Sequence, residues 1–96
     1  MRFAYKKRYL KQFDRFSRQE QLLIHETDRQ VRAYYVTRQA PFGLRIKLLY
    51  ARDPLKIFEA RVTRGTRIVW VEENDLVYFG LVGSHDDVTH YLRSLH

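Results

Sequence analysis

The spacing of apolar residues changes along this chain of 96 residues, and that change limits the fold more than any other feature. Up to about residue 38 apolar residues recur every three or four positions, as in amphipathic helices. From Leu44 onward the period becomes two, which is the alternation of strands. Helical spacing followed by strand spacing predicts helices packed on a sheet, an α+β fold.

Four consecutive strands are predicted after the change of period. They cover residues 44–50, 56–63, 66–73 and 76–83. The dipeptides Arg64-Gly65 and Asn74-Asp75 between the later strands suit hairpin turns. We therefore expect these strands to be antiparallel to their neighbours.

Two helices are predicted before the strands. The apolar spacing from Tyr9 to Phe16 indicates the first helix, with a short strand at residues 2–5 before it. Ser-Arg-Gln-Glu at 17–20 is a capping box that starts the second helix, over residues 18–38. Two helices joined so tightly should form an antiparallel hairpin. The buried stripe expected on the second helix is Leu23, Thr27, Val31 and Tyr34 or Tyr35.

A third helix is predicted at residues 87–95, where apolar residues return to helical spacing. The expected order is β-α-α-β-β-β-β-α, an antiparallel sheet with its helices mainly on one face. The length suits one compact unit, so residues 1–96 are expected to form a single domain.

The composition excludes several classes of site. The chain has no cysteine, which rules out disulfides, thiolate zinc sites and a cysteine nucleophile and favours the cytoplasm. No apolar run approaches the ~18 residues of a membrane helix, so no contact with a membrane is expected. No cofactor is expected either.

Positive charge is concentrated in the first half of the chain. Residues 1–48 hold 12 lysines and arginines against 4 acidic residues, whereas residues 49–96 hold 6 against 7, and the net charge of the whole is +7. Such a field favours a polyanion such as RNA, DNA, a ribosome or an acidic protein. A solvated basic helix face is the alternative interpretation.

Two arginines flank one predicted turn. Arg61 and Arg67 lie on adjacent strands at positions that converge on the sheet face away from the helices. Together they would form a patch suited to phosphate, because the planar guanidinium matches phosphate oxygens. The alternative is an ion pair of Arg61 with Glu59 or Glu72 on an exposed face.

The end of the last strand reads GLVGSHDDVTHYL, at residues 80–92. Ser84 suits a helix N-cap, and acidic residues after it favour the positive end of the helix dipole. Capping does not explain His85. Histidine is a residue type suited to exchange a proton beside a basic patch, and the alternative is that this one is incidental. Asp86 and His90 are spaced to share a metal, but no third ligand is in view, so no metal site is expected.

Three segments in this order resemble the RelE/ParE family of small bacterial toxins from type II toxin–antitoxin modules. They are GLRIKLL at 43–49, IFEARVTRGTRIVWV at 57–71 and VYFGLVGSHDDVTHYL at 77–92. The resemblance implies a helical hairpin against an antiparallel sheet, with a short C-terminal helix. In the RelE-like branch it also implies a concave sheet face that cuts messenger RNA in the ribosomal A site.

The resemblance also implies roles for individual residues. Arg67 matches an arginine that binds the scissile phosphate, and Arg61 falls on another basic position of the same face. His85 matches a position where some members use a histidine as the general acid, and Tyr91 matches a tyrosine that some nucleases need near the substrate. Paired lysines of some members are absent, because Ile57 and Glu59 stand in their place.

The preferred hypothesis is therefore a ribosome-dependent mRNA endonuclease (an mRNA interferase) that inhibits translation and requires no metal. Its expected partners are the ribosome, mRNA and an acidic antitoxin with which it forms a hetero-oligomer. One alternative is a ParE-like poison of DNA gyrase. Another is a non-toxic family member that acts as an antitoxin-bound corepressor.

Overall fold

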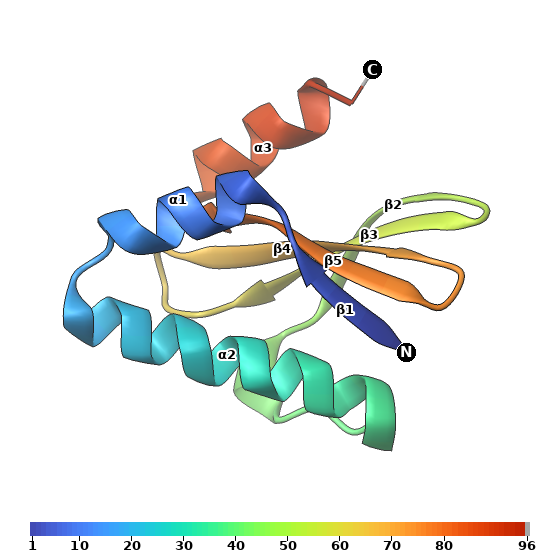
Figure 1. Cartoon of the computed structure of the whole chain (residues 1–96), viewed down its shortest axis with the longest axis horizontal. Helices are drawn as coiled ribbons and strands as arrows, with labels where there is room; N and C mark the ends of the chain where they lie inside the picture. Colours follow the sequence, from blue (N-terminus) through green and yellow to red (C-terminus); the bar gives the residue numbers. More distant parts are fainter. Residues whose placement is uncertain (96) are drawn as a thin grey trace.

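The computed structural model describes residues 1–95 as a five-stranded sheet with helices on both of its faces (Figure 1). The α+β fold class is confirmed. The elements in chain order are β1 (Arg2–Tyr5), α1 (Lys7–Arg15), α2 (Arg18–Thr37), η1 (Phe42–Leu44), β2 (Lys47–Arg52), β3 (Leu55–Arg61), β4 (Arg67–Glu73), β5 (Leu76–Gly83) and α3 (His85–Arg93).

The sheet has the strand order β1-β5-β4-β3-β2. Strands β2 to β5 form the predicted antiparallel meander, but β1 pairs in parallel with β5, so the sheet is mixed. After β1 the chain continues along β5. The amide of Lys6, the residue before α1, donates to the Phe79 carbonyl at 2.9 Å, and the Val82 amide donates to Oε1 of Gln12 in α1 at 3.1 Å. Helix α1 thus satisfies part of the β5 edge that β1 leaves open.

Both predicted capping motifs are present. The side chains and amides of Ser17 and Glu20 bond reciprocally at the start of α2, and Ser84 and Asp87 do the same at the start of α3. Helix α3 therefore begins at His85, two residues before the predicted start. Strand β2 begins at Lys47 rather than at Leu44, because η1 and a left-handed Arg45 (φ 47°) occupy the positions before it.

The core on one face of the sheet is covered by α1 and α2, which run in opposite directions in Figure 1. Trp70 and Phe79 are fully buried there, and the Trp70 indole donates to Tyr35 Oη at 2.7 Å. The buried stripe of α2 includes Ile24, whereas the predicted Leu23 is 46% exposed. That prediction was wrong by one residue, because the stripe from Thr27 and Val31 continues back to Ile24 at intervals of three and four.

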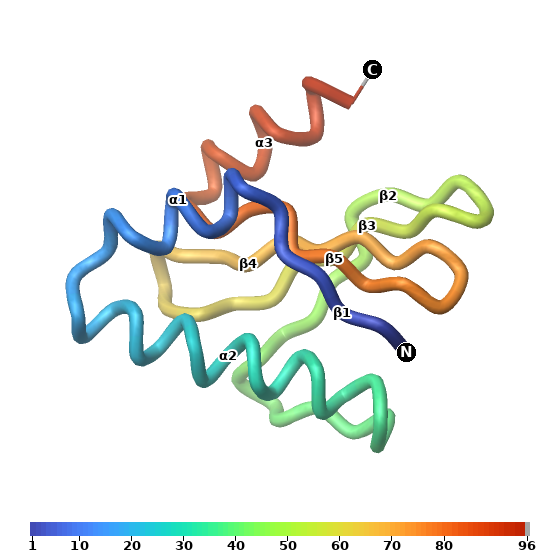
Figure 2. Tube along the Cα trace, viewed as in Figure 1, coloured from blue at the N-terminus to red at the C-terminus, as the bar shows by residue number. Residues whose placement is uncertain are grey.

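The opposite face of the sheet is covered in part by α3. Ile57, Val69 and Val71 project from β3 and β4 on this side and pack near Leu81 and Val88. The prediction of helices mainly on one face therefore holds for α1 and α2 but not for α3. The trace in Figure 2 shows the β3–β4 turn at the opposite end of the sheet from the β2–β3 and β4–β5 turns. Within residues 1–95 no helix combines the length and apolarity that crossing a membrane requires.

Candidate functional site

A pocket of about 350 Å³ opens on the α3 face of the sheet, where the β3–β4 hairpin meets the start of α3. We call it the arginine pocket. It is lined by Arg45, Ile46, Lys47, Glu59, Arg61, Arg67 and His85. Three of the four residues predicted from the sequence, Arg61, Arg67 and His85, therefore lie around one space.

The β3–β4 hairpin brings the two arginines together. Arg61 and Arg67 are direct partners in the antiparallel register, the last pair before the turn. Their side chains share the face of Ile57 and Val69, because side chains alternate along each strand. The predicted convergence away from the α1–α2 face is what the register produces.

Arg67 is held by several groups. Its Nε lies 3.2 Å from Glu59 Oε2, and its Nη1 donates to the carbonyls of Thr63 at 3.0 Å and Arg64 at 3.2 Å. The Arg67 and Glu59 side chains are only 15% and 12% exposed. The ion pair with Glu59, which the alternative interpretation placed at Arg61, forms at Arg67 instead and fixes the Nε side of the Arg67 guanidinium.

Arg61 has a different environment. Its Nε is buried and has no hydrogen-bond partner in the described part of the chain. A buried donor without an acceptor is costly, particularly on a charged group. The Arg61 side chain also lines the arginine pocket, so an anion bound there would lie beside a guanidinium that has an unsatisfied donor.

His85 is the first residue of α3 and is exposed at the pocket. The cap beside it is complete without the imidazole: Asp87 N donates to Ser84 Oγ at 3.1 Å and Ser84 N donates to Asp87 Oδ2 at 2.8 Å. The histidine is therefore free to face a ligand. Its backbone is fixed by the strand end on one side and by the cap on the other.

Two further cations were missed by sequence reasoning. Lys47 stands opposite Glu59 in the β2–β3 register, and Arg45 enters from the loop before β2, with its guanidinium 5.8 Å from the centre of the Phe42 ring. The sequence signal was the pair of basic residues in GLRIKLL, but their face depends on a register that shifts between Leu48 and Tyr50. Glu59 is the single carboxylate among the pocket residues.

Tyr91 does not line the arginine pocket. It projects from α3 toward α1 and β5: its ring is 5.7 Å from the Arg8 guanidinium carbon, and its hydroxyl faces Gly80. Burial, aided by the nearby Tyr78, raises the pKa of the Tyr91 hydroxyl. The role at the substrate that the resemblance implied for Tyr91 stays a prediction.

No group of three or more potential metal-binding side chains occurs within residues 1–95. Asp86 and His90 therefore have no third such ligand beside them in that range. The arginine pocket instead combines four permanent cations with one carboxylate and one imidazole. This set can bind an anion and can also accept and donate a proton.

No family model matches the sequence, and no curated protein matches it. Solved structures do match. In the archaeal RelE–RelB complex from Pyrococcus horikoshii OT3, the matching chain has a TM-score of 0.69 and 13% identity, over 86% of this chain and 92% of that chain. The YoeB/ParE toxin from Agrobacterium tumefaciens has a TM-score of 0.63 and 16% identity, with coverage of 88% and 99%.

The DinJ–YafQ complex from E. coli matches with a TM-score of 0.62 and 12% identity, over 92% of this chain and 98% of that chain. Identities this low describe shared architecture. The chain has the fold of RelE-, YafQ- and YoeB-type toxins of toxin–antitoxin systems.

Proposed function

We propose that this chain, which has a RelE-type toxin fold, is the toxin of a toxin–antitoxin pair and cleaves messenger RNA on the ribosome without a metal ion. One observation supports this proposal above all. Arg61, Arg67 and His85 line a single pocket together with Glu59. Such a set matches what cleavage of an RNA phosphodiester by its own 2′-hydroxyl requires: anion binding, a proton acceptor and a proton donor.

In the proposed reaction the 2′-oxygen of one nucleotide attacks the adjacent phosphorus. A bond from the 2′-oxygen to phosphorus forms, and the bond from phosphorus to the 5′-oxygen of the next nucleotide breaks. The products are a 2′,3′-cyclic phosphate and a 5′-hydroxyl. The proton of the attacking hydroxyl must be accepted, and the departing oxygen must be given one.

The pocket residues divide these tasks. Arg61 binds a non-bridging phosphate oxygen from the wall of the pocket. Arg67 adds its Nη2, because Glu59 holds its Nε and the turn carbonyls hold its Nη1. Glu59, as the carboxylate of the pocket, accepts the 2′ proton. His85 protonates the leaving 5′-oxygen.

Arg45 and Lys47 add positive charge from the β2 side of the pocket. They stabilise the extra negative charge that develops on the phosphate in the transition state. Lys47 stands opposite Glu59, one of the two β3 positions where the resemblance suggested lysines, so the pocket has a cation from the neighbouring strand there.

The proposed partner is an acidic antitoxin, with which the chain forms a hetero-oligomer in the cytoplasm. The excess positive charge of residues 1–48 supports this choice. Two of the matching structures, RelE–RelB and DinJ–YafQ, are complexes of two proteins. An acidic segment that folds on contact would meet the basic helices.

The decisive experiment expresses the wild-type chain and maps mRNA 5′ ends and gyrase-linked DNA breaks in the same cells. We expect in-frame mRNA cuts without DNA breaks. His85→Ala should lower single-turnover cleavage on programmed ribosomes by ~100-fold or more, the scale of losing a positioned proton donor. His85→Gln should be almost as inactive, because an amide cannot deliver a proton.

Ser84→Ala is the matched control at the same helix start. It removes the cap but keeps the imidazole, so it should lower stability by ~1 kcal/mol and leave the chemical step nearly intact. DNA breaks without mRNA cuts would replace the nuclease with a gyrase poison. Full cleavage by His85→Ala would remove His85 from the mechanism.

A further inference from the structure

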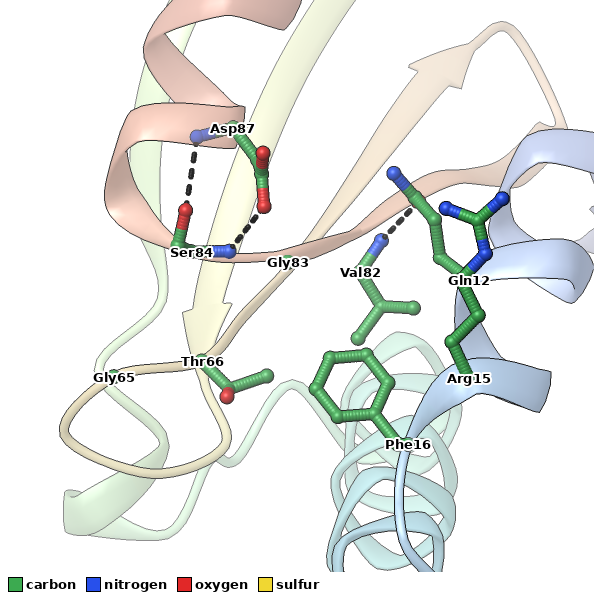
Figure 3. Close-up of a pocket in the computed structure, with 9 residues that line it drawn as sticks. All are labelled: Gln12, Arg15, Phe16, Gly65, Thr66, Val82, Gly83, Ser84 and Asp87. Atoms are coloured by element: carbon green, nitrogen blue, oxygen red, sulfur yellow. Dashed lines mark hydrogen bonds between the residues drawn. The ribbon is translucent and has the colours of Figure 1, made fainter.

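A second pocket, of about 420 Å³, lies on the other side of the α3 start (Figure 3). We call it the α1 pocket. The end of α1 contributes Gln12, Arg15 and Phe16, and the β3–β4 turn contributes Thr66. The end of β5 and the first turn of α3 complete it with Ser84 and Asp87. Nothing in the proposed mechanism uses this space.

The two pockets share a wall. Thr66 lines the α1 pocket, and the next residue, Arg67, lines the arginine pocket. Likewise Ser84 lines the α1 pocket and His85 lines the arginine pocket. Gly83, beside Ser84, is the register partner of Arg67. The wall between the two pockets is therefore the start of β4 and the end of β5. An RNA strand with a phosphate at Arg67 and His85 reaches the α1 pocket by crossing this wall alone.

The groups around the α1 pocket are those that hold a nucleobase. In Figure 3 the Asp87 carboxylate lies across the opening from Gln12 and Arg15, with the ring of Phe16 below them. Aromatic rings stack on bases, and amide, hydroxyl and charged groups read base edges. The volume is within the range of small-molecule sites and is sufficient for one base.

Several of these polar groups are fixed but not saturated. Gln12 Oε1 accepts from the Val82 amide, which orients the side chain and leaves both Nε2 hydrogens for a ligand. Asp87 Oδ2 accepts from Ser84 N, which leaves Oδ1 as an acceptor. The α1 pocket thus presents an oriented donor and an oriented acceptor before any ligand binds.

We infer that the α1 pocket binds the base on the 3′ side of the cut and sets the nucleotide preference there. This inference rests on the proposed nuclease function. The leaving 5′-oxygen belongs to the downstream nucleotide, and His85 protonates that oxygen. The downstream nucleotide must then lie on the His85 side of the phosphate, next to Ser84 and the α1 pocket.

The first test measures binding without chemistry. Four 2′-deoxy dinucleotides that share a 5′ thymidine and differ in the 3′ base are titrated into the protein, and backbone amide shifts are followed by NMR. Gly65 and Gly83 also line the α1 pocket, so we expect their amide signals to shift with the preferred dinucleotide. Inorganic phosphate should move only amides around the arginine pocket.

Two variants remove groups from the α1 pocket without touching the proposed catalytic residues. Thr66→Val keeps the shape of the side chain and removes the hydroxyl, and Arg15→Ala removes an exposed guanidinium. Lys11→Ala is the matched control, because it removes one charge from the same exposed helix but does not line the α1 pocket. Arg15→Ala and Thr66→Val should abolish the dinucleotide shifts at Gly83, whereas Lys11→Ala should keep them.

The second test sequences the cut sites of the same proteins on programmed ribosomes. Each α1 pocket variant should weaken the base preference 3′ of the cut by about fivefold, the value of one hydrogen bond near 1 kcal/mol. Dinucleotides that shift only the amides moved by phosphate, or variants with unchanged preference, would overturn the base site while leaving the nuclease intact. Base-dependent shifts at Gly83 in a chain that cuts no RNA would retain the base site and refute the nuclease.

Discussion

Arg61 and Arg67 stand opposite each other at the end of one hairpin, yet they are held differently. Arg67 is bonded to Glu59 and to turn carbonyls, so it stabilises the β3–β4 turn as well as facing the arginine pocket. Arg61 leaves a buried Nε without a partner among residues 1–95. In the proposed mechanism Arg67 therefore has a structural role beside its functional one, whereas Arg61 makes no such bond to the turn in the portion of the chain that the structure describes.

Replacing each arginine with alanine should separate these roles. Arg61→Ala is expected to reduce single-turnover cleavage by ~100-fold, since an oriented phosphate donor contributes ~3 kcal/mol, with little change in stability. Arg67→Ala should lose cleavage and also lower the free energy of unfolding by ~1–2 kcal/mol, because charged hydrogen bonds to the turn are lost. Urea unfolding curves beside the cleavage assay measure both quantities.

Arg67→Lys is the informative companion, since it keeps the charge and loses the planar fork. We expect it to recover little of the turn stability or of the cleavage. Equal stability losses for Arg61→Ala and Arg67→Ala would contradict the distinction between the two arginines.

The sequence predicted the positions of some candidate site residues better than those of others. Arg61, Arg67 and His85 converge as expected, because alternation along strands and a short turn determine which side chains share a face. Which arginine pairs with Glu59 depends on side-chain conformation, and alternation does not specify it. Tyr91 was chosen because it matches a tyrosine of the family that the sequence resembles, and such a match does not reveal that its hydroxyl faces Gly80.

At the scale of elements, α3 packs on the sheet through a close contact with a strand. A Cβ added at Gly80 of β5 would lie 2.7 Å from Tyr91 Oη and 3.3 Å from the Tyr91 ring carbon that bears it. Glycine at this position is therefore what permits Tyr91 of α3 to pack against β5. The contact fixes α3 and, through it, the position of His85.

Gly80→Ala should lower the free energy of unfolding by ~1–3 kcal/mol, the usual range for overpacking. Tyr91→Phe removes the oxygen that the new methyl group would meet. The double variant should thus be more stable than Gly80→Ala alone, and a thermal-unfolding double-mutant cycle measures that coupling. Additive losses would mean that the Tyr91 hydroxyl is not what excludes a side chain at Gly80.

Element types were predictable from the sequence, and the connections between them less so. A capping box marked α2, an N-cap serine marked α3 and turn dipeptides marked the hairpins, because these signals depend on neighbouring residues alone. The start of β2 was wrong because a left-handed Arg45 ends the preceding turn. The parallel β1–β5 pairing depends on residues far apart in sequence, which local patterns do not relate.

At the scale of the whole molecule, the excess charge of the first half falls largely on exposed helices. Lys7, Arg8, Lys11 and Arg15 follow one another along α1, and all four are exposed. Charges on this surface act over about a Debye length, ~10 Å at 0.1 M salt. A partner attracted in this way should be acidic, and its binding should be sensitive to salt.

We expect the adjacent gene to encode the proposed antitoxin. Its binding to this chain should weaken as salt is raised from 0.1 to 0.5 M, as measured by calorimetry. Lys11→Glu should weaken binding at low salt more than the control Lys56→Glu does. Lys56 is also exposed, but it lies on β3 in the second half of the chain. Equal effects of the two reversals would place the interface away from α1. Failure of the adjacent protein to co-purify or to rescue growth would remove the main support for the antitoxin pairing.

The parallel pairing of β1 with β5 has a consequence for the order of folding. Arg2 pairs with Leu76, whereas the meander from β2 to β5 is closed by short hairpins, so loop-closure entropy favours early formation of the meander. The arginine pocket draws all its residues from 45–85, within or beside that meander, whereas the α1 pocket waits for α1 to dock. Pulsed hydrogen exchange should therefore protect the Val69 amide before that of Val82, which bonds to Gln12. The cleft proposed to bind phosphate would thus exist before the chain acquires the neighbouring surface proposed to select a base.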